Sequence, residues 1–233
     1  KQEILVPRWG EMTNMARQVS WQPLLKPTFW VVLDRNLAML YGALPVAMVG
    51  MYTSGEGVAY FKLAFGYMLL AMTVLGPIST LLNVHFPTVQ ATDATQLRRT
   101  FVRASLYATL LSVGVTLVVV AISPWVFRLL YGQVYVPAVQ YVFGLALFGG
   151  LFGLGVGLGP LWRAIDRVHI SILINLIVLG VGIPFGIWSI THWHIWGAVI
   201  MVTFWYTISH IVSFVYLLRA LPIGRVEISS NNG

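Results

Sequence analysis

The chain of 233 residues contains no cysteine, which excludes disulfide bonds, zinc–thiolate sites, iron–sulfur clusters and cysteine nucleophiles. Charge is also scarce, because charged residues make up 9% of the chain. A soluble domain normally carries about 25% charged residues. Since so few charges cannot cover a water-facing surface, we expect an integral membrane protein.

Acidic residues are rarer still, with seven scattered along the chain. The sequence contains neither H-E-x-x-H nor G-x-S-x-G, and no loop concentrates acids and histidines, so no catalytic set is visible. His192 and His194 lie close together in THWHIW but lack a third metal ligand. We therefore expect a protein that is not an enzyme and that holds no metal ion or other cofactor.

Hydrophobic residues, by contrast, make up 58% of the chain, and its mean hydropathy is +0.81. They form apolar stretches that each approach the roughly 20 residues needed to cross a bilayer as a helix. The predicted fold is all-α, a polytopic membrane protein with a bundle of six transmembrane helices. We expect one transmembrane domain over 27–220, between a cytoplasmic or interfacial segment at 1–26 and a cytoplasmic tail at 221–233. The six stretches are 30–52, 59–84, 105–127, 137–161, 168–190 and 196–218.

The formal net charge of +7 would suggest nucleic acid as a partner in a soluble protein. Here most of the 14 lysines and arginines fall in connections on one side of the predicted bundle, and only Arg128 lies clearly on the other. The positive-inside rule then places both termini in the cytoplasm, as six crossings require. We therefore expect the lipid bilayer, and no nucleic acid, as a partner. The residues on the cytoplasmic side are Lys1, Arg8, Arg17, Lys26, Arg98, Arg99, Arg103, Arg163, Arg167, Arg219 and Arg225.

Residues 149–160 read GGLFGLGVGLGP, which raises the question of a phosphate-binding loop. No lysine follows the run, no strand precedes it, and an open loop in lipid would leave amide groups unpaired. We expect a helix in which Gly149, Gly153 and Gly157 share one face. Such a face allows close packing against a neighbouring helix or sliding past one, and lining of a substrate path is a third interpretation. Pro45 permits a kink in the first span, and kinked, glycine-rich helices suit a protein that changes shape.

Ionisable residues inside membrane spans are costly, and they are therefore candidates for function. Asp34 and Arg35, followed by Asn36, lie about one turn inside the first span, and Lys62 lies about one turn inside the second. They either form a polar patch that faces a cavity, or reach the membrane surface as snorkelling and capping side chains. The sequence leaves both interpretations open.

The last span carries a stripe of polar residues at steps of three and four, which must face protein or water. His210 in this stripe either relays protons or makes an interhelical hydrogen bond, and both interpretations remain open. The stripe consists of Thr203, Tyr206, Thr207, His210 and Ser213.

Several short motifs occur in order along residues 27–220. They are LDR at 33–35, GVAY at 57–60, FP at 86–87, the arginine-bearing QLRRTFVRAS, and LLYG at 129–132 followed by Tyr135 and Pro137-Ala138. Together they resemble the second lobe of polysaccharide flippases in the multidrug/oligosaccharidyl-lipid/polysaccharide exporter superfamily. The LLYG-x-x-Y turn is the most telling of these matches.

The resemblance implies two six-helix lobes that form a V around a central, often cationic cavity. It implies transport of a lipid-linked oligosaccharide, such as an O-antigen precursor, from the cytoplasmic to the outer leaflet by alternating access. This chain would supply one lobe. Because it begins at Lys1, we expect it to be the C-terminal half of a longer protein, or else to pair with another subunit. The expected location is the inner (plasma) membrane of a bacterium.

The resemblance also suggests roles for residues in such a lobe. Arg35 and Lys62 would neutralise the pyrophosphate of the lipid-linked sugar inside the apolar core, where an unpaired charge is costly. Aromatic rings such as those of Tyr41 and Tyr206 would stack on sugars. The gating parts would be the kinked first span, with Pro45, and the helix face that carries Gly149, Gly153 and Gly157. The predicted substrate-binding residues are Arg35, Lys62, Asp34, Asn36, Tyr41, Tyr206 and His210.

Two other functions remain open. The first is a scaffold or accessory subunit of an envelope-polysaccharide synthesis complex that does not itself transport. The second is an intramembrane transferase. A stable partner lacking any cavity would favour the scaffold, and a cluster of acids and histidines facing one pocket would favour the transferase.

Overall fold

The computed structural model describes residues 22–92 and 94–222, and this part of the chain is almost entirely helical. The expectation of a helical fold is therefore confirmed. The predicted segment 1–26 and tail 221–233 lie largely outside the described residues. The α-helices are α2 (Gln22–Tyr52), α3 (Gly55–Met72), α4 (Gly76–Thr92), α5 (Ala94–Val126), α6 (Val139–Gly144), α7 (Ala146–Gly155), α8 (Leu158–Ala164) and α9 (Val168–Ala220). Three short helical turns join them, namely η1 (Thr73–Leu75), the π-helical η2 (Phe127–Tyr131) and η3 (Gln133–Ala138).

Four helical runs among the described residues are long and apolar enough to cross a membrane. A fifth is added if a pair of shorter helical runs, bent by 51°, counts as one broken span. The expectation of several membrane-spanning helices thus agrees with the structure. The prediction of one unbroken helix over 137–161 is wrong, because η3, α6, α7 and α8 share this stretch. The four runs are Thr28–Tyr52, Gly55–Ala91, Gln96–Tyr131 and Val168–Ala220, and the bent pair is Gln133–Gly144 with Ala146–Ala164.

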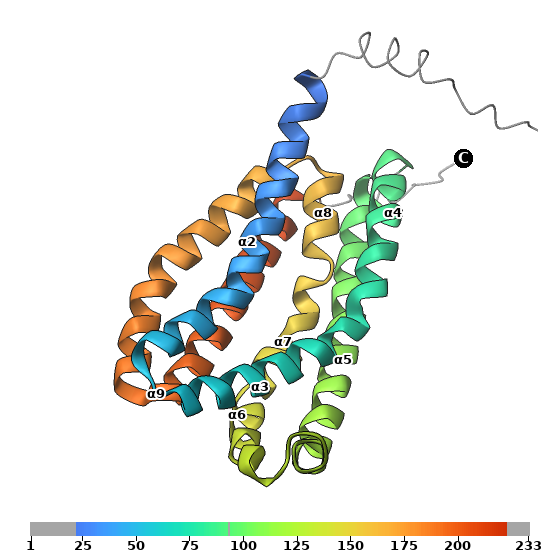
Figure 1. Cartoon of the computed structure of the whole chain (residues 1–233). Coiled ribbons are helices and arrows are strands. Elements are labelled where there is room, and N and C mark those ends of the chain that lie inside the picture. The colour runs from blue at the N-terminus through green and yellow to red at the C-terminus, as the bar shows by residue number, and fades with distance from the viewer. Residues whose placement is uncertain (1–21, 93, 223–233) are drawn as a thin grey trace, which may run out of the picture.

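Helix α9 consists of two antiparallel arms, which Figure 1 shows side by side. The chain reverses at His194, whose φ of 51° and ψ of −124° are not helical. Across the turn, the Ser189 hydroxyl of the first arm donates a hydrogen bond of 3.0 Å to the carbonyl oxygen of Gly197 in the second arm. The first arm, 168–193, and the second arm, 195–220, each contain one of the apolar stretches expected from the sequence.

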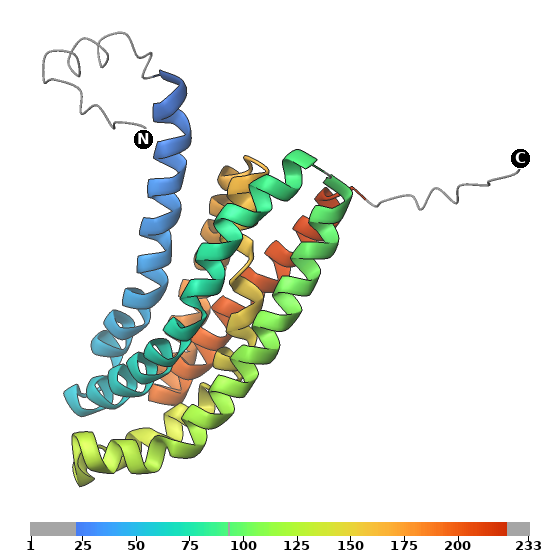
Figure 2. The ribbon, with the colours of Figure 1, turned by 90° about the vertical axis from the view of Figure 1, so that its right-hand side faces the viewer.

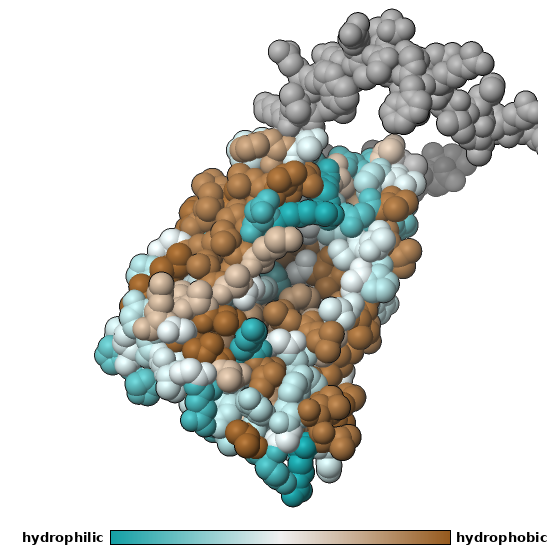
Figure 3. Space-filling view, in the orientation of Figure 1, coloured by the Kyte–Doolittle hydropathy of each residue, from teal (hydrophilic) through white to brown (hydrophobic). Residues whose placement is uncertain are grey.

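The core lies where α3, α5, α7 and α9 meet, and it contains fully buried aromatic side chains such as Phe61, Phe148 and Trp205. The opposite face of α5 is also apolar, since Leu117 is 65% and Val118 is 60% exposed. Hydrophobic side chains cover much of the molecular surface in Figure 3. This distribution suits a helix bundle whose outer surface contacts lipid.

The glycine face of α7 packs against α5. A Cβ atom on Gly153 would collide with the backbone of Ala108, and one on Gly149 would overlap the side chain of Thr116. The Ser112 hydroxyl also donates a hydrogen bond of 2.6 Å to the carbonyl oxygen of Gly149. These glycines, like Gly157, are buried, and they allow the two helices to approach at backbone distance.

The helix expected over 149–160 is interrupted, since α7 ends at Gly155 and α8 begins at Leu158. Pro160 has no N–H group to bond the carbonyl oxygen of Val156, and each glycine costs a helix about 1 kcal/mol relative to alanine. The chain therefore forms a turn between Gly155 and Leu158 and then continues as α8.

Both ends of the described chain lie at the same end of the bundle, together with the α4–α5 connection and the α8–α9 turn (Figures 1 and 2). We call this the arginine-rich end, because it carries Arg98, Arg99, Arg163, Arg167 and Arg219. The α2–α3 turn and the turn between the arms of α9 lie at the other end. Helix α2 bends over its second half in Figure 2, where Pro45 is buried.

Candidate functional site

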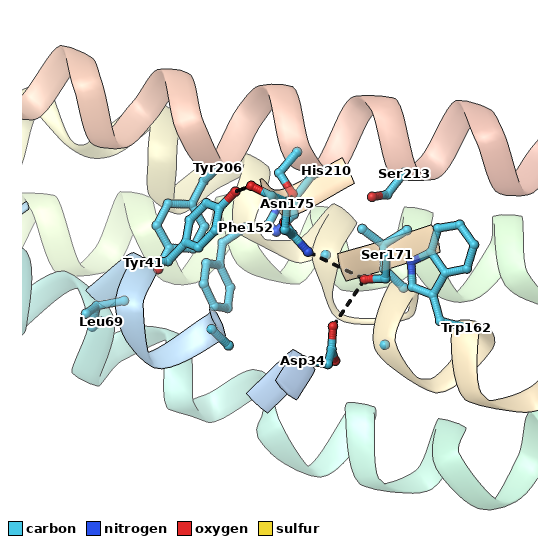
Figure 4. Close-up of a pocket in the computed structure, with 15 residues that line it drawn as sticks. Asp34, Tyr41, Leu69, Phe152, Trp162, Ser171, Asn175, Tyr206, His210 and Ser213 are labelled. Carbon is cyan, nitrogen blue, oxygen red and sulfur yellow. Dashed lines mark hydrogen bonds between the residues drawn. The ribbon is translucent and has the colours of Figure 1, made fainter. Parts of the chain in front are cut away.

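A cavity of about 360 Å³ opens between α2, the α7–α8 region and both arms of α9. Figure 3 shows a recess in the middle of this face, with hydrophilic side chains along one rim. Figure 4 shows polar side chains of α2 and α9 directed toward one another inside it. The lining residues used below are Asp34, Tyr41, Phe152, Ser171, Asn175, Tyr206, Ser209 and His210.

A chain of hydrogen bonds joins three helical segments across this cavity (Figure 4). The Ser171 hydroxyl donates to Oδ1 of Asp34 over 3.2 Å, and the Asn175 amide nitrogen donates to Oγ of Ser171 over 3.5 Å. At the other side of the amide, the Ser209 hydroxyl donates to Oδ1 of Asn175 over 2.6 Å. The bonds link α2 to both arms of α9, so the polar groups are held in a fixed arrangement.

The spacing of these residues along their helices explains why they meet. Ser171 and Asn175 are four residues apart in the first arm, and Tyr206, Ser209 and His210 occupy one face of the second arm. Each face would be costly in lipid, because hydroxyl and amide groups there would lose their partners. Packing the two arms against α2 gives the side chains of Ser171, Asn175 and Ser209 hydrogen-bond partners inside the bundle.

Aromatic rings form the wall next to the hydrogen-bond chain. The Tyr41 hydroxyl donates to the carbonyl oxygen of Asn175 over 3.2 Å, and the Tyr41 ring lies edge-on to that of Tyr206 with centroids 5.5 Å apart. The Tyr206 ring also packs against the rings of Phe148 and Phe152, with centroid-to-centroid distances of 4.8 Å and 6.2 Å. The cavity therefore offers hydrogen-bonding groups and flat apolar surfaces side by side.

A second cavity of about 420 Å³ adjoins the first and shares Phe152, Tyr206 and His210 with it. Arg163, at the end of α8, lines this second cavity. Its Nε and Nη2 both donate to Oδ1 of Asn83 in α4, over 3.0 and 2.8 Å. A guanidinium group is thus positioned at the arginine-rich end of the joined cavities.

The structure brings together four of the residues predicted as substrate-binding, namely Asp34, Tyr41, Tyr206 and His210. The other three, Arg35, Asn36 and Lys62, are exposed and line neither cavity. Asn36 instead donates to the carbonyl oxygen of Val32 in its own helix. The roles predicted for these three residues in binding stay predictions.

Several residues of the joined cavities were not predicted from the sequence, and those used in the argument here are Arg163, Ser171, Asn175 and Ser209. The pair Ser171 and Asn175 carried a usable signal, because polar residues four apart in an apolar stretch share a helix face. From the sequence, Arg163 was assigned to a cytoplasmic loop and used only to predict orientation in the membrane. The linear sequence does not show that its side chain reaches a cavity.

The predicted gating residues lie outside both cavities. The buried glycines of α7 and the buried Pro45 of α2 are packing positions in this arrangement, and their role in movement stays a prediction. Among residues 22–92 and 94–222, no group of three or more His, Asp or Glu side chains is arranged to hold a metal ion.

A protein-family model described as "Polysaccharide biosynthesis protein" matches residues 10–140, which is more than half of the chain. No curated protein and no solved structure matches the chain. The matched range includes Asp34 and Tyr41 of the cavity wall. It ends before α7, α8 and α9, which supply most of that wall.

Proposed function

This chain belongs to the polysaccharide biosynthesis protein family, and on this premise we propose that it is one lobe of a flippase for a lipid-linked oligosaccharide. The lobe crosses the membrane six times, through α2, α3–α4, α5, α6–α8 and the two arms of α9. Both termini and the arginine-rich end face the cytoplasm, as the positive-inside rule requires. The location is the inner membrane of a bacterium, and the protein transports its substrate and catalyses no reaction.

The polar cavity inside an apolar bundle is the observation that carries this proposal. Carboxylate, amide and hydroxyl groups are expensive at membrane depth, and they occur there chiefly where they face water, protein or a transported molecule. The chain from Asp34 through Ser171 and Asn175 to Ser209 presents several donors and acceptors to one space. The hydroxyl groups of a sugar can both donate to and accept from these groups.

The aromatic wall suits the same ligand. Sugar rings have apolar C–H faces, and the rings of Tyr41 and Tyr206 offer flat surfaces against which such faces can stack. These two residues were predicted to contact sugars, and both line the cavity.

Arg163 is the residue that we propose for the pyrophosphate group of the substrate. It lines the second cavity, and its guanidinium is already oriented by Asn83. Arginine recognises phosphate oxygens with paired N–H donors, and such charge-assisted bonds are the stronger ones. Arg163 therefore takes the role first predicted for Arg35 and Lys62, whose side chains line neither cavity.

A second lobe would complete the transport path, since the recess in Figure 3 is open on one face. This lobe is either another part of a longer protein or a partner subunit. Alternating access then consists of rocking one lobe against the other around the cavity.

The test is transport of a fluorescent lipid-linked oligosaccharide by the full protein in proteoliposomes. We expect Arg163→Ala to lower the rate about tenfold or more, because a charge-assisted bond to phosphate is lost, and Arg163→Lys to lower it less. Arg219→Ala is the matched control, since Arg219 is exposed at the end of α9.

Full activity of Arg163→Ala would contradict the proposed anion site. Loss of activity in Arg35→Ala or Lys62→Ala, with Arg163→Ala unaffected, would return the role to the residues first predicted. Wild-type protein that forms a stable synthesis complex but moves no lipid would favour the accessory-subunit alternative.

A further inference from the structure

A groove of about 410 Å³ runs along the second arm of α9, between this arm and the α6–α7 region. It is separate from the polar cavities and shares no lining residue with them. Thr203 and Thr207 are its polar residues, and the Thr203 hydroxyl donates to the carbonyl oxygen of Val199 in its own helix. The remaining lining residues are Gly144, Leu147, Trp196, Val199, Ile200, Phe204 and Ile208.

The groove covers one half of the second arm. It begins at Trp196, just after the turn at His194, and reaches Ile208, near the middle of an arm that ends at Ala220. This stretch of helix rises about 18 Å, and half of a bilayer's hydrocarbon core is about 15 Å thick. The length of the groove therefore matches the depth of one leaflet.

Two aromatic rings form preformed walls for the groove. The Trp196 ring packs against Tyr141 with centroids 5.4 Å apart, and the Phe204 ring packs against Phe185 at 4.8 Å. Gly144 allows the Trp196 ring to pack closely against the backbone of α6, since a Cβ there would lie 2.5 Å from the indole ring. A ligand entering this groove needs little rearrangement of its walls, which favours binding.

The surface around the groove is apolar as well. On the same arm, Ile200 is 39%, Ile211 is 44% and Val215 is 40% exposed. The groove is thus continuous with a surface that contacts lipid if the arm crosses the membrane. Trp196 lies at the end of the groove next to the turn. Tryptophan is enriched at membrane–water interfaces, so this position suits the membrane surface.

We propose that this groove holds one acyl chain of a bilayer phospholipid from the leaflet at the His194 end. The ester groups of that lipid lie near the turn, and the chain runs past Phe204 toward Ile208 at the bilayer centre. The inference rests on the membrane crossings proposed above, but it does not depend on transport of an oligosaccharide. A lipid held in this way would stabilise the contact between α6–α7 and the second arm.

The experiment uses the full protein in nanodiscs of phosphatidylcholine that contain a small fraction of a photoreactive analogue. One probe carries its diazirine near the end of the acyl chain, and the other carries it near the glycerol. Mass spectrometry locates the labelled residues. We expect the chain-end probe to label Leu147 and Ile208, and the glycerol-side probe to label residues around Trp196.

Thr203→Phe fills the groove, and it should reduce chain-end labelling of Ile208 about tenfold, as expected when about two methylene groups lose their burial. Val215→Phe adds the same ring to the lipid-facing surface outside the groove, so it should leave this labelling unchanged. Ile200→Trp provides a second filling variant if Thr203→Phe does not fold. The thermal unfolding temperature of each variant checks its folding.

Equal labelling along all lipid-facing helices, or unchanged labelling in both filling variants, would overturn the proposal. So would protection of the groove from both probes together with cross-links to a second protein chain, because protein would then occupy it. These results leave the flippase proposal untouched, since that proposal is tested by substrate transport through the other cavities.

Discussion

Asn175 is the residue that connects the groups of the polar cavity. Its side chain donates to Ser171 and accepts from Ser209, and its backbone carbonyl oxygen accepts from Tyr41. One side chain thus couples the two arms of α9, and its backbone ties them to α2. We expect changes at its partners to affect stability as well as binding, because buried acceptors are costly when they lose a donor.

Ser209→Ala tests how much a single hydrogen bond contributes to this coupling. It removes the 2.6 Å hydrogen bond to Asn175, and the free energy of unfolding should fall by about 1 kcal/mol, as for interhelical hydrogen bonds in other membrane proteins. Thr191→Ala is the control, since Thr191 is exposed and bonds only within its own helical segment and to the neighbouring His192. Thermal unfolding in detergent measures both. An unchanged stability in Ser209→Ala would contradict the assigned coupling.

Single residues of the cavity were predictable where a polar side chain interrupts an apolar span, as at Asp34 and His210. The direction in which each side chain points could not be predicted. Adjacent residues on a helix point roughly 100° apart, so Asp34 faces the cavity while Arg35 is exposed. The phase of α2 is set by its packing against α9, and the sequence of α2 alone does not contain that information.

At the scale of elements, the contact between α5 and α7 depends on glycine. Gly153→Ala should lower the free energy of unfolding by about 2 kcal/mol, because the new Cβ meets the backbone of Ala108, which cannot move aside as a side chain can. Gly150→Ala, three residues earlier, is the matched control. Its Cβ would lie at an ordinary 3.5 Å from Val113, so alanine should be neutral or stabilising through its better helix propensity.

Equal stability of the two alanine variants, measured by thermal unfolding, would show that α5 and α7 are not packed at backbone distance. It would then favour the interpretation in which the glycine face slides past its neighbour. Loss of transport without loss of stability in Gly153→Ala would support the same interpretation.

Apolar runs were sufficient to predict most helices but not their breaks. The turn at His194 falls in the gap between the predicted stretches 168–190 and 196–218, because polar residues there ended both runs. The break between α7 and α8 was missed, since GGLFGLGVGLGP is apolar throughout and hydropathy carries no signal for a turn. Only the geometry of Pro160 and its neighbours, together with tertiary packing, determines where such a helix stops.

At the scale of the whole molecule, arginines gather at one end of the bundle. A polar recess opens on one face between α2 and α7–α8 (Figure 3). The arginine-rich end is the basis of the proposed orientation of the lobe, and the recess is the proposed site for a head group in transit. Family membership rests on residues 10–140, whereas most of the recess is built by elements after this range. The function is therefore best tested at the recess itself.

The most direct measurement asks whether the recess holds water and is then occupied by the lipid-linked oligosaccharide. Because this chain has no cysteine, Ala38→Cys places a single thiol on the cavity wall, and Ala47→Cys places one on the exposed surface of the same helix. We predict that a membrane-impermeant maleimide labels the thiol at position 38 and not the one at position 47, and that added lipid-linked oligosaccharide slows labelling at position 38. Equal labelling of both thiols, or a rate at position 38 that saturating substrate leaves unchanged, would contradict the proposed function.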